Sequence, residues 1–259
     1  MGTTKLTRKE ILAEDPIHAA IIHIVDAFRS RGKIIAGAAA IAALLAAGVY
    51  FGMRYLDNRE MAAQQELALG VAFFHGSVDP SAPDNPLQKG PVPLFKSDEA
   101  KYKAAIESFN KVISTYGSSK LSVLARYYLG LSQLRLEQKD EAVRNLEQVR
   151  NNTRDRTVGY LAKQVLARVY LDSGNPKETI SILEGMIKDP QCELPKELLR
   201  LDLAKAYLGS GNRAEAGKVL QQAKEDSKPS MLNSMVVTEL EQLEKSTGAG
   251  SGSPPPPQP

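Results

Sequence analysis

Residue types that commonly carry catalysis or bind metals are scarce in this chain. Its 259 residues include one cysteine, Cys192, three histidines and no tryptophan. A single cysteine excludes an intramolecular disulfide and is expected to be a small buried residue. His75 is the only histidine after residue 53, so neither a histidine-based triad nor a histidine-rich metal site is predicted there. Glycine-rich phosphate loops and HExxH, CxxC and GxSxG motifs are missing, so we expect no enzyme and no cofactor.

Basic and acidic residues are also nearly equal in number. The chain has 33 basic and 30 acidic residues, a formal net charge of +3. Nucleic-acid-binding domains usually carry a strong basic excess. This balance argues against nucleic acid, or an acidic substrate, as the partner.

Charge is missing altogether from residues 34–53, IIAGAAAIAALLAAGVYFGM. A helix of that length spans about 30 Å, the thickness of the hydrocarbon core of a bilayer. The stretch is apolar on all sides, whereas the other predicted helices are amphipathic. We interpret residues 34–55 as a single transmembrane helix. A buried helix of a soluble core and a cleaved signal peptide are the alternatives.

The basic residues around this stretch predict its orientation. Arg29, Arg31 and Lys33 lie just before it, and only Arg54 and Arg59 follow nearby. The positive-inside rule then places residues 1–33 in the cytoplasm and the rest outside. Within this leader, the sequence from Asp15 to Gly32 predicts an amphipathic helix. In the span, Gly48 and Gly52 form a GxxxG step for packing of another helix, which leaves a homodimer open.

After the span the chain repeats itself. Three segments beginning at Leu124, Leu161 and Leu198 align without gaps, with Gly130, Ala167 and Ala204 recurring every 37 residues. A second small position follows twelve residues later. Each unit therefore reads as two amphipathic helices that cross at small residues and are joined by a polar turn, which predicts an all-α solenoid.

This pattern resembles the tetratricopeptide repeat. The matching positions are Leu129, Gly130, Ala142, Tyr170, Tyr207, Ala216 and Ala223. Two positions depart from it, Gln133 in place of tyrosine and Thr179 in place of alanine. The period is also three residues longer than the usual 34, with the extra residues between units.

A first unit is expected upstream, from Leu69, Gly70 and Phe73 to Ala105. Its two helices are separated by an insert at about residues 77–97 that has five prolines and is not expected to be helical. Leu94 and Phe95 are expected to hold this insert against the first hairpin. The repeat domain spans 56–245, with a capping helix marked by Leu232, Met235, Val236, Leu240 and Leu243. Residues 246–259 have the composition of a disordered tail.

The resemblance implies a partner groove lined by the first helix of each unit. The groove positions form four rows: Leu124, Leu161 and Leu198; Leu134, Leu171 and Leu208; Tyr127, Gln164 and Leu201; Leu131, Arg168 and Lys205. The Lys and Asn residues with which related domains clamp a carboxyl terminus are mostly missing from these rows. We therefore expect an apolar or extended polypeptide as the ligand. In the alternative reading, part of each leucine row packs between units.

The leader with its TRKE start, the single anchor and the repeats together resemble the bacterial YfgM-type family of ancillary SecYEG translocon subunits. This resemblance implies an inner-membrane protein with a periplasmic repeat domain. It would be a non-catalytic scaffold that meets secreted chains and passes them to chaperones. The alternative is a scaffold of another envelope complex, in cell division or secretion.

Overall fold

A computed structural model describes residues 16–88, 90–152, 155–226 and 231–248 of the chain. Predictions that concern residues 1–15 and 249–259, namely the start of the leader and most of the tail, lie outside this described part. The contacts divide the chain into two compact units, Met1–Asn58 and Arg59–Pro259. Each unit is described separately below.

The first unit is occupied by the helix α2 (Pro16–Phe74), which continues into the second unit. The prediction of a separate leader helix ending at Gly32 is wrong. A glycine inside a helix costs only about 1 kcal/mol relative to alanine, and no proline follows until Pro80. The disfavoured residue is therefore accommodated without ending the helix.

The apolar part of α2 is exposed. This helix is long and apolar enough to cross a membrane, by length and composition. Leu44 is 73% exposed and Phe51 69%, and the space around Gly48 and Gly52 is open. The apolar window of this helix is unburied among the described residues.

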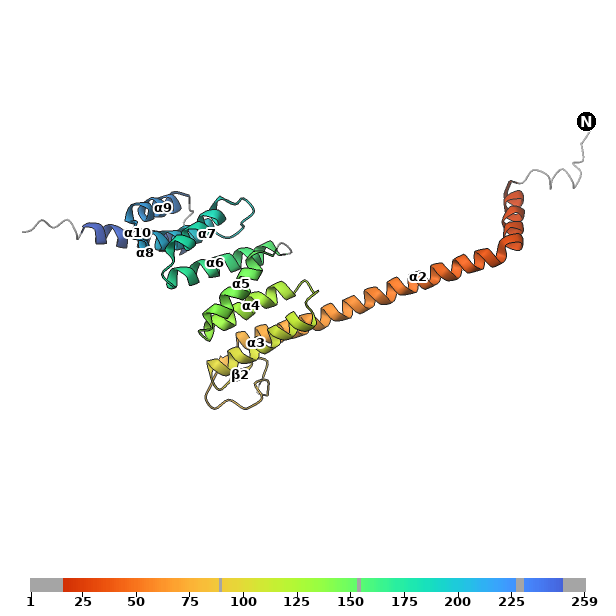
Figure 1. Cartoon of the computed structure of the whole chain (residues 1–259), viewed down its shortest axis with the longest axis horizontal. Helices are drawn as coiled ribbons and strands as arrows, with labels where there is room; N and C mark the ends of the chain where they lie inside the picture. The colour runs from red at the N-terminus through yellow and green to blue at the C-terminus, as the bar shows by residue number, and fades with distance from the viewer. Residues whose placement is uncertain (1–15, 89, 153–154, 227–230, 249–259) are drawn as a thin grey trace, which may run out of the picture. The chain divides into compact units, whose positions relative to one another are not determined.

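The second unit is a stack of helical hairpins (Figure 1). Its helices after α2 are α3 (Asp98–Thr115), α4 (Ser122–Arg135), α5 (Lys139–Arg150), α6 (Arg156–Asp172), α7 (Pro176–Lys188), α8 (Lys196–Gly209), α9 (Arg213–Asp226) and α10 (Met231–Gly248). Each helix from α3 to α10 packs on the next one in the chain, and α4, α6 and α8 also contact one another in series. The predicted all-α solenoid is confirmed.

The small residues lie where the helices of a hairpin cross, as predicted. Gly130, Ala142, Ala167 and Ala216 are buried. A Cβ placed on Gly130 would lie 2.8 Å from Cγ of Leu146, so α4 and α5 approach too closely for a side chain there. This close approach is the physical reason why small residues recur.

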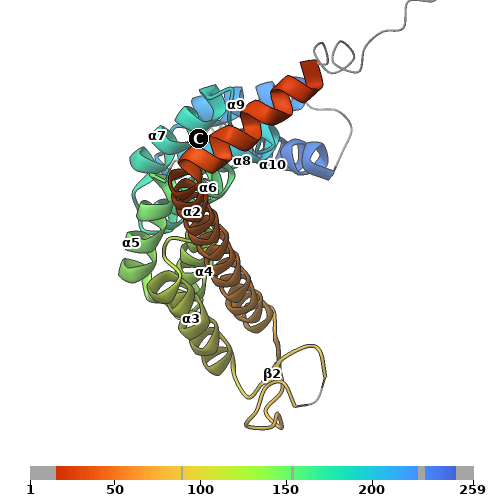
Figure 2. The same cartoon turned by 90° about the vertical axis from the view of Figure 1, so that its right-hand side faces the viewer.

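The first hairpin pairs the end of α2 with α3 (Figure 2). Leu67 of α2 shares an apolar cluster with Ala105 and Phe109 of α3. Glu66 and Lys111 form an ion pair across the two helices at 2.6 Å. The first repeat helix is therefore the end of α2, and no break separates it from the apolar segment.

The insert contains a small sheet that the sequence did not predict. β1 (Ser77–Val78) and β2 (Leu94–Phe95) pair in parallel. Phe95 is 6% exposed and packs edge-on against Phe73, with ring centroids 5.5 Å apart. The prediction that Leu94 and Phe95 hold the insert against the first hairpin is therefore confirmed for Phe95, while Leu94 is half-buried.

The helix α10 covers the last hairpin. Val236 and Leu240 are buried in a cluster with Leu201 and Leu220, as expected for a capping helix. Met235, which was assigned to the same apolar stripe, is 44% exposed. The helix also continues to Gly248, three residues into the range 246–259 that was expected to be tail.

Candidate protein-binding groove

The predicted groove residues lie on α4, α6 and α8, which are neighbours in the stack. A hollow of about 420 Å³ opens between α4 and α6. Its walls are Leu131, Leu134, Arg135, Lys139, Val165, Arg168, Val169 and Asp172. Of the predicted residues, the structure therefore brings together Leu131, Leu134 and Arg168 at one site.

The chemistry of this hollow is mixed. Leucine and valine side chains provide apolar surface, and three cations and one carboxylate stand among them. Sequence reasoning missed Val165 and Val169, which follow Leu161 at helical spacing on α6 and were detectable by that spacing. Arg135 and Lys139 come from the α4–α5 turn region, where proximity to the groove depends on how the hairpin folds.

Two positions assigned to the groove are buried instead. Leu201 is 3% exposed and belongs to the apolar cluster under α10. Gln164 is 8% exposed, and its Nε2 donates to Oδ2 of Asp202 at 3.2 Å. Their row was assigned by register, but Gln164 meets Asp202 of α8 and Leu201 packs in the cluster that α10 covers. These two residues cannot contact a partner directly.

The basic position Arg168 is also engaged. Its Nε and Nη2 donate to Oδ2 of Asp202 at 3.2 and 3.0 Å, and its side chain stays 54% exposed. Asp202 itself is buried on α8, so the ion pair ties two consecutive units together. Arg168 therefore presents a partly neutralised charge at the mouth of the hollow. Sequence reasoning missed Asp202 because nothing local links it to Arg168.

The leucine rows are divided between surface and packing. Leu124 and Leu134 are half-buried against apolar clusters, and Leu208 is packed against the last one. Leu171 lies beside Gly209, since a Cβ there would be 3.2 Å from its Cδ1. Leu161 and Leu198 are half-buried, while Lys205 is exposed. The contacts of Leu124, Leu134 and Leu208 with apolar clusters favour the alternative, in which part of each row packs between units, for these three leucines. Leu131 is the row member that lines the hollow without joining an apolar cluster.

Tyr127 completes the predicted set. Its ring packs against the cluster between α4 and α6, and burial raises the pKa of its phenol. Tyr127 is half-buried and is not among the residues that line the hollow.

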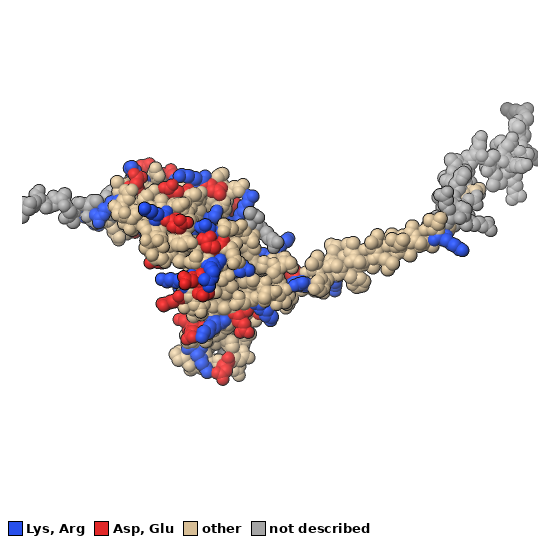
Figure 3. All heavy atoms as spheres, viewed as in Figure 1, with Lys and Arg blue, Asp and Glu red and all other residues tan. Residues whose placement is uncertain are grey.

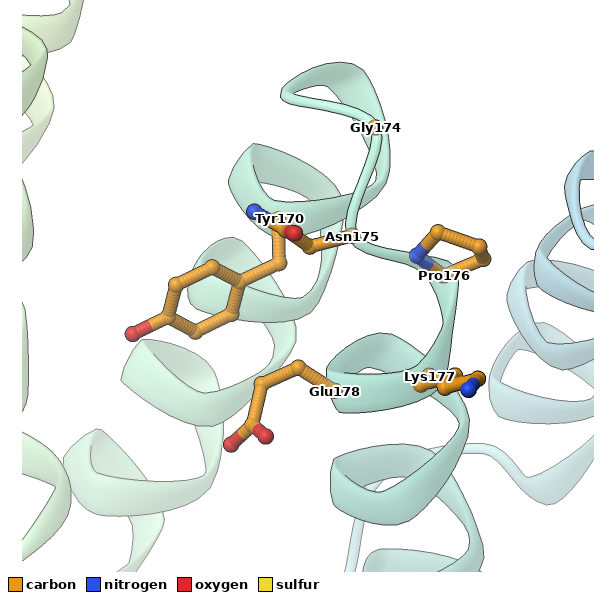
Figure 4. A pocket seen from close by; sticks show the side chains of 6 residues that line it. All are labelled: Tyr170, Gly174, Asn175, Pro176, Lys177 and Glu178. Atoms are coloured by element: carbon orange, nitrogen blue, oxygen red, sulfur yellow. The ribbon is translucent and has the colours of Figure 1, made fainter.

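A second, larger hollow of about 700 Å³ lies at the α6–α7 turn (Figure 4). Tyr170, Asn175 and Glu178 line it, and Gly174 forms the turn with φ of +77°. The hydroxyl of Tyr170 donates to Oε1 of Glu147 at 3.0 Å, so its donor is already used within the stack. We therefore attribute this hollow to the shape of the turn between the two helices of the repeat.

The tyrosine–glutamate bond recurs one repeat later. The hydroxyl of Tyr207 donates to Oε1 of Glu184 at 2.7 Å. Since a hydrogen bond to a carboxylate stabilises the protonated phenol, it raises the pKa of Tyr207 to about 12, and it lowers the pKa of Glu184. Both bonds join the second helix of one unit to the first helix of the next. The repeat tyrosine thus serves stacking between units.

The two departures from the repeat pattern have local partners. Oε1 of Gln133 accepts a bond from Nδ2 of Asn145 at 2.9 Å, in place of a tyrosine contact. Thr179 is buried and its hydroxyl donates to the carbonyl of Ala167 at 2.9 Å. Each substitution therefore keeps the hairpin contact with a hydrogen bond.

No metal-binding group of histidine, cysteine, aspartate or glutamate occurs among the described residues. Cys192 is buried within an apolar cluster, as expected from the sequence. In the described part of the chain every buried side-chain nitrogen or oxygen has a hydrogen-bond partner.

The geometry defines a class, an α-solenoid of helical hairpins with a partly apolar groove, the type of fold that serves as a protein-interaction scaffold. The chain belongs to the tetratricopeptide repeat-like domain family, whose model matches residues 28–245. None of the curated proteins matches it.

Two solved structures are similar to this chain, both of a putative kinesin light chain from Podosopora anserina with nearly identical TPR-like repeats, one of them a variant with a single substitution. Each is 22% identical to this chain, covers 57% of it and 80% of its own length, and superposes with a TM-score of 0.48.

Proposed function

We propose that this protein is a membrane-anchored, non-catalytic scaffold that binds polypeptides in the groove of its repeat domain. The hollow between α4 and α6 carries the proposal. It combines apolar walls with exposed polar groups, which suits an extended chain of mixed side chains. The partners we propose are subunits of the SecYEG translocon and secretory chains that emerge from it and go on to chaperones.

The anchor sets where these partners would be met. With residues 34–55 in a bacterial inner membrane and the leader in the cytoplasm, the repeats would face the periplasm. Tethering raises the local concentration of the groove near emerging chains, which favours weak contacts with unfolded segments. Carbonate washing of membranes should leave the full chain in the pellet, and protease added outside spheroplasts should digest the repeats. Release into the wash, or protection from external protease, would overturn the anchoring or the orientation.

Photocrosslinking in intact membranes tests the groove. A photoreactive amino acid at Leu131 lies on the wall of the hollow. The matched control is a photoreactive amino acid at Arg144, an exposed position on α5, the second helix of the same repeat unit. Translocon subunits and newly made secretory chains are expected from position 131 and not from 144. Equal products from both sites would refute binding in this groove.

A scaffold in another envelope complex is the second candidate, and the insert favours it. Val78, Leu87 and Val92 are 41%, 47% and 58% exposed in a segment that the small sheet holds in place. A preformed surface of this kind suits a folded partner. A photoreactive group at Val92 that captures one stable folded protein, with no secretory chain captured at Leu131, would favour this candidate.

A further inference from the structure

Two adjoining hollows mark one edge of the repeat stack, outside the groove. One, of about 440 Å³, has Arg126 and Gly117 in its wall, and the other, of about 190 Å³, has Arg156 and Lys163. They share Asn151 and Asn152. Among the described residues, neither hollow has an acidic side chain in its wall, although the visible face of the repeat unit carries both signs of charge (Figure 3).

Three of the four cations that line these hollows contact neutral groups. Nη1 of Arg126 donates to Oδ1 of Asn145 at 3.1 Å, and Nη1 of Arg156 donates to Oε1 of Gln191 at 2.6 Å. Nζ of Lys163 lies 4.7 Å from the centre of the Tyr160 ring. Within the part of the chain that the structure describes, these positive charges are therefore held in place by neutral partners.

Two carboxylates at this edge are engaged in other bonds. Asp155 caps α6, with Oδ1 accepting from the Val158 amide at 3.0 Å. Asp189 accepts the Tyr160 hydroxyl at 2.5 Å. Arg150, which also lines the smaller hollow, is paired with Glu147 at 2.7 Å. Bonds to neutral donors leave both carboxylates charged, and the Tyr160 hydroxyl, with help from Lys163, lowers the pKa of Asp189. With Arg150 and Glu147 cancelling, the three cations Arg126, Arg156 and Lys163 still exceed these two carboxylates by one charge.

The same edge carries the start of the repeat unit. Arg59 donates to the carbonyl of Thr115 and lies over the ring of Tyr116, with 5.9 Å between its Cζ and the ring centroid. Tyr116 is the residue before Gly117 in the sequence, and Gly117 lines the larger hollow. Arg59 follows the apolar stretch by six residues in the sequence, so the repeat unit begins close in sequence to the proposed anchor.

We propose that this edge of the repeat domain binds the anionic phospholipid headgroups of the membrane in which the chain is anchored. The proposal rests on the proposed anchoring of residues 34–55. Phosphate oxygens are the acceptors that arginine and lysine side chains bind best, and the two hollows hold the cations apart for separate headgroups. The anchor and the edge would together restrain the groove relative to the bilayer.

Fluorescence in proteoliposomes containing the full chain tests the proposal. An environment-sensitive probe is attached at Ser118→Cys, an exposed position in the same loop, or at Ser173→Cys, an exposed position at a hairpin turn. Cys192 is buried, and the wild-type protein labelled in parallel measures any background from it. Vesicles consist of phosphatidylcholine alone or mixed with phosphatidylglycerol, and quenchers are attached to the lipid headgroups.

Quenching at Ser118→Cys is expected only with phosphatidylglycerol, and it should weaken in high salt. Each cation near an anionic surface raises the ratio of membrane-bound to unbound repeat domain about fivefold. The triple variant R126Q, R156Q and K163Q should therefore lower this ratio about a hundredfold, and the quenching with it. The control K177Q, R213Q and K218Q changes equal charge on α7 and α9, away from the hollows, and should leave the quenching unchanged.

Three outcomes would overturn the proposal: equal quenching in both lipids, equal quenching at Ser118→Cys and Ser173→Cys, or no effect of the triple variant. Salt-sensitive binding of a single-stranded RNA by the edge cations, without lipid quenching, would also overturn it. Carbonate extraction of the same samples separates this result from the proposed anchoring, since an anchored chain with an unquenched edge refutes only the lipid contact.

Discussion

Replacing Gly70 by alanine tests whether the end of α2 is the first helix of the repeat stack. A Cβ at this position would lie 2.6 Å from Cε1 and 2.9 Å from Cδ1 of Phe109. Phe109 is fully buried and stacks on Tyr128 with ring centroids 5.6 Å apart. The ring is therefore confined on its far side, and the new methyl group must push the two helices apart.

The magnitude follows from two opposed effects. Overpacking of a filled core costs about 1–3 kcal/mol. Alanine gains up to about 1 kcal/mol over glycine in a helix. We expect G70A to lower the free energy of unfolding by about 0–2 kcal/mol, which is the overpacking cost less the gain in helix propensity. Gly185, inside α7, has no atom within 4 Å of the place that a methyl group would occupy, so G185A should instead raise it by up to about 1 kcal/mol.

Urea unfolding of the full chain in detergent micelles, followed by far-ultraviolet circular dichroism, measures both variants against the wild type. The two substitutions are chemically identical, so propensity cancels in their difference and the helix crossing remains. If G70A and G185A changed the unfolding midpoint in the same direction and by the same amount, α2 would not pack on α3 as described, and the assignment of the first repeat unit would be refuted.

Three further predictions concern contacts within the stack. Since the pKa of Tyr207 rises from 10.0 to about 12 on folding, its hydrogen bond contributes fully below pH 10, and the stability difference between wild type and Y207F should vanish as the pH rises through 12. D202A should cost about 1–3 kcal/mol in urea unfolding because it leaves buried and charged donors without their acceptor, whereas D172A at an exposed position should change stability by less than about 0.5 kcal/mol. L134D should lower the thermal midpoint because this side chain packs on an apolar cluster. L131D should lower the midpoint less, while reducing crosslinking from a photoreactive group at Val169 in the same hollow; the opposite order would mean that the groove wall is misassigned.

The sequence alone determined that helical hairpins form and how many times the hairpin unit repeats. Spacing of three and four residues defines each helix, and the period of 37 between Gly130, Ala167 and Ala204 locates each crossing. These features are local, so the pattern that encodes them lies within one unit. The apolar stretch was recognisable for the same reason, because its length and composition suffice to define it.

Tertiary packing decided which groove positions are open. Leu201 and Gln164 share a register row with Tyr127, yet they are buried, because the spacing between α6 and α8 and the cover of α10 depend on contacts between units. Asp202 meets Arg168 from 34 residues away, a pairing that no local pattern encodes.

The same distinction applies to the leader helix and to the insert. Gly32 was expected to end a helix, but helix termination depends on the whole balance of neighbouring propensities and not on one residue. The pairing of β1 with β2 joins the two ends of a proline-rich insert, and only the fold of the first hairpin brings those ends together. Periodicity therefore settles which elements form, whereas the contacts between distant elements settle which side chains remain for a partner.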